Sequence, residues 1–157
     1  MKIIPYEERF RDDMIFMILE AKDALGSIPR LNGDLLDIRG NYIIKGDMFW
    51  LAVEEDGEGR ERVIGSLGYS SVPGTDEVFL HRFFVKCTRK RQGIGTRLLQ
   101  TAEAHLLRAG KTAVRVHLGA PAERWFESRA FYSRYGYRET EPRYLMKELP
   151  RISGKHE

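Results

Sequence analysis

The spacing of apolar residues along this chain predicts several helices. Apolar side chains recur at helical intervals over residues 10–25, as expected for one buried face, and Gly26 ends the pattern. The same interval returns over residues 94–109, where polar side chains occupy the opposite face. A third helix is predicted over residues 121–136, and a shorter helical stretch over residues 35–42.

The remaining stretches have the composition and period of β-strands. They are rich in Val, Ile, Leu, Phe and Tyr, and glycine or proline turns separate several of them. The predicted strands are residues 2–6, 48–54, 62–72, 77–85 and 113–118, with residues 137–141 and 143–148 as a closing hairpin. The pattern therefore predicts a mixed α/β fold, with one domain over residues 1–149 and a flexible tail over residues 150–157.

Composition narrows the class of protein. The 157 residues can bury one core, and 42% apolar with 31% charged residues is typical of a globular chain. No apolar run reaches the roughly 20 residues that cross a bilayer, and the start lacks a signal-peptide core, so we expect a cytoplasmic protein without a membrane partner. Cys87 is the only cysteine, which excludes an internal disulfide and a paired-cysteine metal site.

A basic turn between a predicted strand and a predicted helix carries the strongest functional signal. Residues 85–96 read VKCTRKRQGIGT. Its glycines let a ligand approach the backbone, and the first N–H groups of a helix lack internal partners and carry about half a positive charge. Arg89, Lys90 and Arg91 add charge that suits further phosphates, such as those of coenzyme A. The turn predicts a diphosphate site, with a merely solvated basic turn as the alternative.

Other ligands of phosphate loops fit this chain less well. The dinucleotide fingerprint requires a small residue where Leu98 stands, so we do not expect NAD. Gly110-Lys111-Thr112 lacks the first glycine of a P-loop and follows a helix, so we do not expect ATP. The net charge of +3 is small and spread along the chain, which gives little support for nucleic-acid binding.

A second motif makes the pattern specific. Phe131-Tyr132 precedes Gly136-Tyr137 at the end of the last predicted helix. Together with Lys90 to Gly95, this motif resembles the GNAT acyltransferases, whose Arg/Gln-x-x-Gly-x-Gly/Ala loop and later Phe-Tyr-x-x-x-Gly-Phe occur in the same order. The resemblance implies a twisted, mostly antiparallel sheet of about six or seven strands flanked by about four helices. It also implies an N-acetyltransferase that uses acetyl-coenzyme A and no metal.

The resemblance assigns roles to individual residues. The backbone of Val85 and Cys87 would hold the pantetheine arm, Ser128 would lie on the cofactor side, and Tyr132 would protonate the departing thiolate as a general acid. Lys90 keeps a positive charge where the family has Arg or Gln, and Trp125 stands where many members have Asn. The amides that would bind the pyrophosphate belong to Arg91, Gln92, Gly93, Ile94, Gly95 and Thr96.

The general base is poorly marked. Phe79 occupies the place where some relatives carry a glutamate. Glu77 and His81 share its face of the strand by alternation and are the candidates, with His117 as a further one. The missing glutamate keeps open a non-catalytic acyl-coenzyme A sensor. The acceptor could be a small-molecule or a peptide amine, and exposed strand edges leave a homodimer open.

Overall fold

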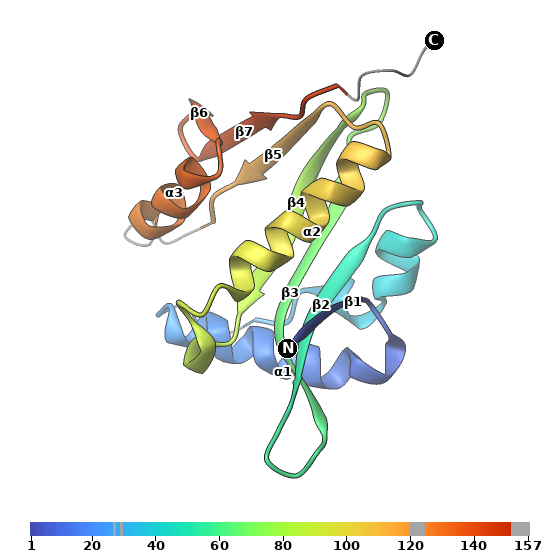
Figure 1. Cartoon of the computed structure of the whole chain (residues 1–157), viewed down its shortest axis with the longest axis vertical. Coiled ribbons are helices and arrows are strands. Elements are labelled where there is room, and N and C mark those ends of the chain that lie inside the picture. The colour runs from blue at the N-terminus through green and yellow to red at the C-terminus, as the bar shows by residue number, and fades with distance from the viewer. Residues whose placement is uncertain (27, 29, 120–124, 152–157) are drawn as a thin grey trace. The chain divides into compact units, whose positions relative to one another are not determined.

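A computed structural model describes the chain except for residues 27, 29, 120–124 and 152–157 (Figure 1). The elements, in chain order, are β1 (Lys2–Pro5), η1 (Glu8–Phe10), α1 (Arg11–Ala24), η2 (Gly33–Leu36), η3 (Arg39–Ile43), β2 (Phe49–Glu55), β3 (Glu61–Ser71), β4 (Glu77–Val85), η4 (Cys87–Arg89), α2 (Ile94–Arg108), β5 (Ala113–His117), α3 (Trp125–Arg134), β6 (Arg138–Glu141) and β7 (Tyr144–Glu148). None of the helices in the described residues is long and apolar enough to cross a membrane.

The described strands form a seven-stranded sheet in the order β1-β2-β3-β4-β5-β7-β6. β1–β2, β2–β3, β5–β7 and β6–β7 pair antiparallel, whereas β4 and β5 pair parallel over Glu77–Phe79. This arrangement confirms the predicted mixed α/β fold with a mostly antiparallel sheet. Backbone contacts divide the chain into two compact units, Met1–Tyr69 with His81–Glu103 and Ser70–Leu80 with Ala104–Glu157.

The core of the first unit forms where the helical pattern predicted a buried face. α1 buries Met14, Met17, Ile18 and Ala21, and Gly26 follows the helix with a φ of 84°, which favours glycine. Met14, Met17 and Ile18 join a larger apolar cluster, to which the residues before α1, the segment after it, β2 and β3 also contribute. Its buried members are Tyr6, Phe10, Met14, Met17, Ile18, Leu35, Ile38, Tyr42, Phe49, Leu51, Val53 and Val63.

The predicted helical stretch over residues 35–42 is present as two short helical segments, the 3₁₀ helix η2 and the π-helix η3. The Asn41 backbone amide still donates to the Asp37 carbonyl (3.0 Å), as in an α-helix. The Asp37 carboxylate accepts from the Gly40 amide (2.9 Å), and the Asn41 side-chain amide donates to the Asp37 carbonyl (2.9 Å). The Asp37 carboxylate therefore caps the start of the second segment, and the break between the two segments falls at Asp37, whose φ of −145° is not helical. Apolar spacing indicates the helical stretch but not this break.

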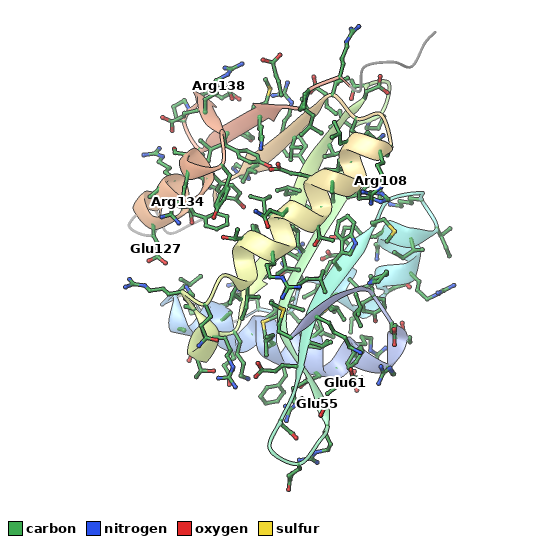
Figure 2. The ribbon with its side chains drawn as sticks, viewed as in Figure 1. Glu55, Glu61, Arg108, Glu127, Arg134 and Arg138 are labelled. Carbon is green, nitrogen blue, oxygen red and sulfur yellow. The ribbon has the colours of Figure 1, made fainter. Side chains whose placement is uncertain are left out.

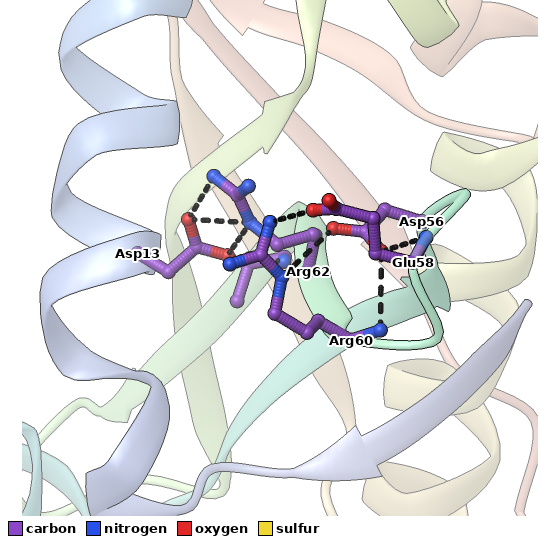
Figure 3. Close-up of polar contacts among 6 residues, drawn as sticks. Asp13, Asp56, Glu58, Arg60 and Arg62 are labelled. Atoms are coloured by element: carbon purple, nitrogen blue, oxygen red, sulfur yellow. Dashed lines mark hydrogen bonds and ion pairs between the residues drawn. The ribbon is translucent and has the colours of Figure 1, made fainter.

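Asp13 attaches α1 to β3 (Figure 3). Its carboxylate accepts from the Val63 amide (2.7 Å) and from the Arg62 guanidinium (2.9 Å). Burial opposes ionisation of Asp13, but these hydrogen bonds outweigh it and lower the pKa of the carboxyl. The attachment lies beside a register shift between β2 and β3 at Ala52 and Val53, where the ladder is interrupted.

In the second unit, β5 lies between β4 and β7. Val114, Val116 and Leu145 are buried, whereas Glu127 and Arg134 of α3 are exposed and project outward (Figure 2). The amide of Leu149 donates to the Thr112 carbonyl, the amide of Thr112 to the Asp76 carbonyl, and the amide of Leu118 to the Arg143 carbonyl. These bonds hold both ends of β5 to the residues that flank β4 and β7.

Candidate active site

The turn between β4 and α2 has a backbone suited to an anion. After η4, Arg91 and Gly93 adopt positive φ angles of 63° and 81°, and α2 begins at Ile94. The Arg97 amide donates to the Gly93 carbonyl (3.0 Å), so the amides before Arg97 lie ahead of that helical bond. Left-handed residues in such a turn direct successive N–H groups into one concave nest, which binds anions.

This nest, defined by residues 91–96, has room for a ligand at Gly93. A methyl group built on Gly93 would meet no atom within 4 Å, and Arg91, Gln92 and Gly93 are exposed. Glycine is therefore required here by backbone conformation and not by crowding. The residues present fit a diphosphate because they offer a nest of backbone N–H groups, a helix N-terminus and two exposed cations, Lys90 and Arg91.

Three contacts fix the chain just before the nest. The Arg89 guanidinium donates to the Glu54 carboxylate of β2 (2.8 Å), the Lys86 amide donates to the Ile64 carbonyl (2.8 Å), and the Lys86 ammonium pairs with Glu20 (3.3 Å). Arg89 was expected to add charge for phosphates. In the structure its guanidinium is paired with Glu54, which anchors the turn to β2.

Gly65 on β3 lets α2 pack closely on the sheet. A methyl group built on Gly65 would lie 2.9 Å from Leu98 Cδ1, 3.1 Å from Ile94 Cγ2 and 3.3 Å from Ala52 Cβ. Ile94 is the first residue of α2, and both Ile94 and Leu98 are buried. The absence of a side chain at Gly65 therefore sets how closely the start of α2, which carries the nest, approaches β3.

β4 presents His81 within the first unit. Buried and half-buried positions alternate from Glu77 to His81, as the strand pattern predicted. The His81 ring lies 6.4 Å from the Tyr42 ring, centroid to centroid, in an edge-on arrangement. Burial, followed by the charge of Arg82, lowers the pKa of His81 below its ordinary value, against a smaller opposing effect of Asp34 and Asp47. The imidazole is therefore neutral at pH 7, as a proton acceptor must be.

Arg82, the next residue, pairs with Asp34 of η2. Its Nε and Nη2 donate to the two carboxylate oxygens at 3.0 and 2.8 Å, and the Tyr42 hydroxyl donates to Asp34 Oδ2 at 2.6 Å. Burial opposes ionisation of Asp34, yet the bonds from Arg82 and Tyr42 lower the pKa of this carboxyl. Burial, reinforced by the bond to Asp34, raises the pKa of Tyr42. This cluster could not be predicted, because Arg82 lies 48 residues after Asp34 along the chain.

Tyr132 lies on α3 in the second unit and is buried. Its ring contacts Phe131 (5.4 Å between centroids) and Tyr137 (5.2 Å), and its carbonyl accepts from the amides of Tyr135 and Tyr137. Burial raises the pKa of the Tyr132 phenol well above 10. The phenol is consequently protonated at every pH at which the protein would work. Ser128, one turn earlier on α3, is half-buried.

Glu77 is engaged in an ion pair. Its Oε1 accepts from Arg115 Nε of the neighbouring strand β5 at 2.6 Å. His117, on the same strand as Arg115, stacks on Tyr144 of β7 at 4.6 Å between ring centroids. Both residues remain candidate bases, but each already has a structural partner.

The predicted site residues are distributed over both units. The first unit holds His81, the strand end at Val85, Cys87 and the whole nest, whereas the second holds Glu77, Ser128 and Tyr132. Trp125 begins α3, and its side chain lies outside the described residues. Across the part of the chain that the structure describes, no group of His, Cys, Asp and Glu side chains is arranged to hold a metal ion.

Comparisons with known proteins agree on one family. The model of the acetyltransferase (GNAT) family matches residues 15–137, and no curated protein matches the chain. A GNAT-family acetyltransferase from Staphylococcus aureus Mu50 is similar in structure, with a TM-score of 0.81, 21% identity, and coverage of 95% of this chain and 99% of that one.

Two further solved structures have the same fold. An aminoglycoside 6'-N-acetyltransferase complexed with coenzyme A has a TM-score of 0.73 and 16% identity, covering 98% of this chain and 100% of its own. The ribosomal-protein-S18-alanine N-acetyltransferase from Escherichia coli has a TM-score of 0.71 and 15% identity, covering 99% and 98%. At these identities the likeness concerns the fold.

Proposed function

Because the chain belongs to the GNAT acetyltransferase family, we propose that it transfers an acetyl group from acetyl-coenzyme A to a primary amine. The observation that carries this proposal is the nest at residues 91–96, where left-handed backbone at Arg91 and Gly93 precedes the N-terminus of α2. A nest of this kind suits a diphosphate, and coenzyme A contains one. A structural neighbour with the same fold is itself complexed with coenzyme A.

The residues that would hold the coenzyme follow β4 and the turn after it. The amides of residues 91–96 would bind the diphosphate, Lys90 and Arg91 would supply charge, and the backbone of Val85 and Cys87 would lie along the pantetheine arm. Ser128 would contribute from α3. Acetyl-coenzyme A supplies the thioester, and the proposal requires no metal.

Transfer of the acetyl group forms a C–N bond and breaks the C–S bond. We assign Tyr132 as the general acid that gives its proton to the departing sulfur while the amine attacks directly in a ternary complex. The raised pKa of Tyr132 keeps the phenol protonated, as a donor must be. Because an ordinary thiol has a pKa of about 8.5, the thiolate is a weaker base than the Tyr132 phenolate, so the transfer is completed only when the phenolate regains a proton.

His81 is the better supported base. It is neutral at pH 7 because burial lowers its pKa, whereas the Glu77 carboxylate is paired with Arg115. His81 would take the proton that the amine loses, directly or through water, and would release it to solvent. The Tyr132 phenolate would take a proton back from solvent, so that the reaction neither gains nor loses a proton. Glu77 and His117 remain alternatives.

The acceptor would be a small-molecule or peptide amine. Structural neighbours include an enzyme that acts on aminoglycosides and one that acts on the alanine of a ribosomal protein, so the fold alone does not select between these classes. We place the reaction in the cytoplasm, in one domain over residues 1–149 followed by the tail 150–157, and leave a homodimer open.

The test compares the kcat of Tyr132→Phe with that of Tyr135→Phe. Each variant loses one phenol hydroxyl, and the two positions are neighbours in the same segment of the chain. We expect Tyr132→Phe to lower kcat roughly 10²- to 10⁴-fold with little change in coenzyme affinity, because general acid catalysis is lost and binding is not. Tyr135→Phe should keep full activity. Equal turnover in the two variants would remove Tyr132 from the mechanism, and coenzyme binding without transfer to any amine would support a sensor instead.

A further inference from the structure

Arg82 has a strained backbone in the middle of β4. Its φ of 53° is in the left-handed region, which costs a non-glycine residue roughly 1–2 kcal/mol. Such a conformation persists only where the surroundings enforce it. One restraint is the hydroxyl of the fully buried Ser66, which donates to the Arg82 carbonyl at 2.7 Å.

The second restraint is the Arg82 side chain. Its guanidinium binds both oxygens of Asp34, and Tyr42 donates to the same carboxylate, as described above. Asp34 belongs to η2 and Tyr42 to η3. We call the cluster of Asp34, Tyr42 and Arg82 the latch, because it ties the segment of residues 33–43 to the strained point of β4.

We propose that the latch positions residues 33–43 beside His81 for the amine acceptor, so that Arg82 and Asp34 are positioning residues of the acceptor side. The inference depends on the proposed function. Tyr42 links the two features because its hydroxyl belongs to the latch while its ring lies edge-on to His81. A shift of residues 33–43 would therefore move the aromatic neighbour of the candidate base.

The latch is separate from the contacts that fix the nest. The turn before the nest is held by Arg89 on Glu54 and by Lys86 on Ile64, and no member of the latch takes part in those bonds. Opening the latch should therefore affect the acceptor and leave coenzyme binding nearly intact. General destabilisation of the protein would weaken acceptor and coenzyme binding together, whereas opening of the latch should weaken acceptor binding alone.

The charges of the latch favour a structural over a ligand-binding role for Asp34. A free carboxylate beside His81 would attract an ammonium group, but both oxygens of Asp34 already accept bonds from Arg82. The pair is half-buried, with side-chain exposures of 30% for Arg82 and 21% for Asp34. Removing one partner leaves the other charge uncompensated in a partly dry position, so the segment should loosen.

The experiment compares Asp34→Asn with Asp37→Asn. Asp37 is an exposed acid in the same segment whose carboxylate accepts from the Gly40 amide, and an asparagine oxygen can accept the same bond, so the control removes one charge without touching the latch. We expect Asp34→Asn to raise the acceptor KM roughly 10-fold or more, as the loss of a charge-assisted bond implies, with the acetyl-coenzyme A KM within about twofold. Amide hydrogen exchange over residues 33–43 should accelerate in Asp34→Asn only.

Three further variants keep the test decisive if Asp34→Asn folds poorly. Tyr42→Phe removes one hydroxyl and should give a smaller change in the same direction, and Arg82→Lys should restore part of what Arg82→Gln loses. Unchanged exchange over residues 33–43 in Tyr42→Phe and Arg82→Gln would overturn the latch. Equal losses of acceptor and coenzyme affinity would overturn its acceptor-side role. A wild-type chain that binds no coenzyme A would instead overturn the proposed function, whereas the exchange comparison needs no ligand.

Discussion

Gly65→Ala should destabilise the protein and weaken coenzyme binding together. The added methyl group would lie 2.9 Å from Leu98 Cδ1, 3.1 Å from Ile94 Cγ2 and 3.3 Å from Ala52 Cβ. Ala52 Cβ is fixed by the backbone of β2, Ile94 is β-branched and rotates little in a helix, and Leu98 is fully buried. Because Leu98 has little space to rotate in the core, the contacts relax chiefly by movement of the start of α2 away from β3.

The size of the effect follows from overpacking. Adding a methyl group to a filled core site costs about 1–3 kcal/mol, and each kcal/mol lowers the melting temperature of a chain of this size by about 2–4 °C. We therefore expect Tm to fall by about 2–12 °C. Because Ile94 carries one of the amides of the nest, displacement of the helix should also weaken coenzyme A binding measured by calorimetry.

Gly57→Ala is the control for Gly65→Ala. A methyl group on Gly57 would meet nothing within 4 Å, so it changes the same atoms without crowding. Thermal unfolding and calorimetry of both variants should separate them clearly. A Gly65→Ala protein as stable as Gly57→Ala would refute the close packing of α2 on β3.

Other predictions concern the contacts around α1 and β4. Asp13→Ala should lower the free energy of unfolding, measured in urea, by about 1–3 kcal/mol, because the part-buried Val63 amide loses its acceptor. Asp12 is exposed, so Asp12→Ala should change this free energy by under about 0.5 kcal/mol. Equal effects of the two substitutions would contradict the role of Asp13. Arg82→Gly should be more stable than Arg82→Ala by about 1 kcal/mol, since only glycine accepts a φ of 53° without strain; the reverse order would contradict the strain. The pKa of His81 is lowered by burial, so its contribution to stability is complete above pH of about 6.5 and is lost as the pH falls from there toward the folded pKa. The free energy of unfolding, measured in urea between pH 7.5 and 5.5, should fall with pH in the wild type and fall less steeply in His81→Gln. Parallel pH dependence in the two proteins would contradict this.

The elements with a strong apolar period could be predicted from the sequence. α1 and α2 match their predicted ranges within two residues because each buries one regular face, and every predicted strand is present within two residues of its ends. The helical stretch over residues 35–42 was also predicted, but its division into two short segments was not, because the break lies at Asp37, where the backbone leaves the helical region and apolar spacing gives no signal.

Only the part of the candidate site that is contiguous in the sequence could be predicted. Gly93 and the basic turn are contiguous, so their spacing alone indicated an anion nest, and the positive φ at Gly93 agrees with that prediction. The latch joins Asp34, Tyr42 and Arg82 across the fold, and the role of Gly65 depends on α2 lying above it. Such long-range contacts leave no periodic trace in one sequence. The same applies to Arg89, whose anchoring partner Glu54 is set by β2.

Calorimetric titration of coenzyme A into the wild type and Gly93→Ala tests the central claim most directly. Alanine at a φ of 81° costs about 1–2 kcal/mol, which should depopulate the nest and weaken binding about 5- to 30-fold, while Gly57→Ala binds like the wild type. A wild-type chain without affinity for coenzyme A, or a Gly93→Ala variant that binds as tightly, would contradict the nest as the diphosphate site.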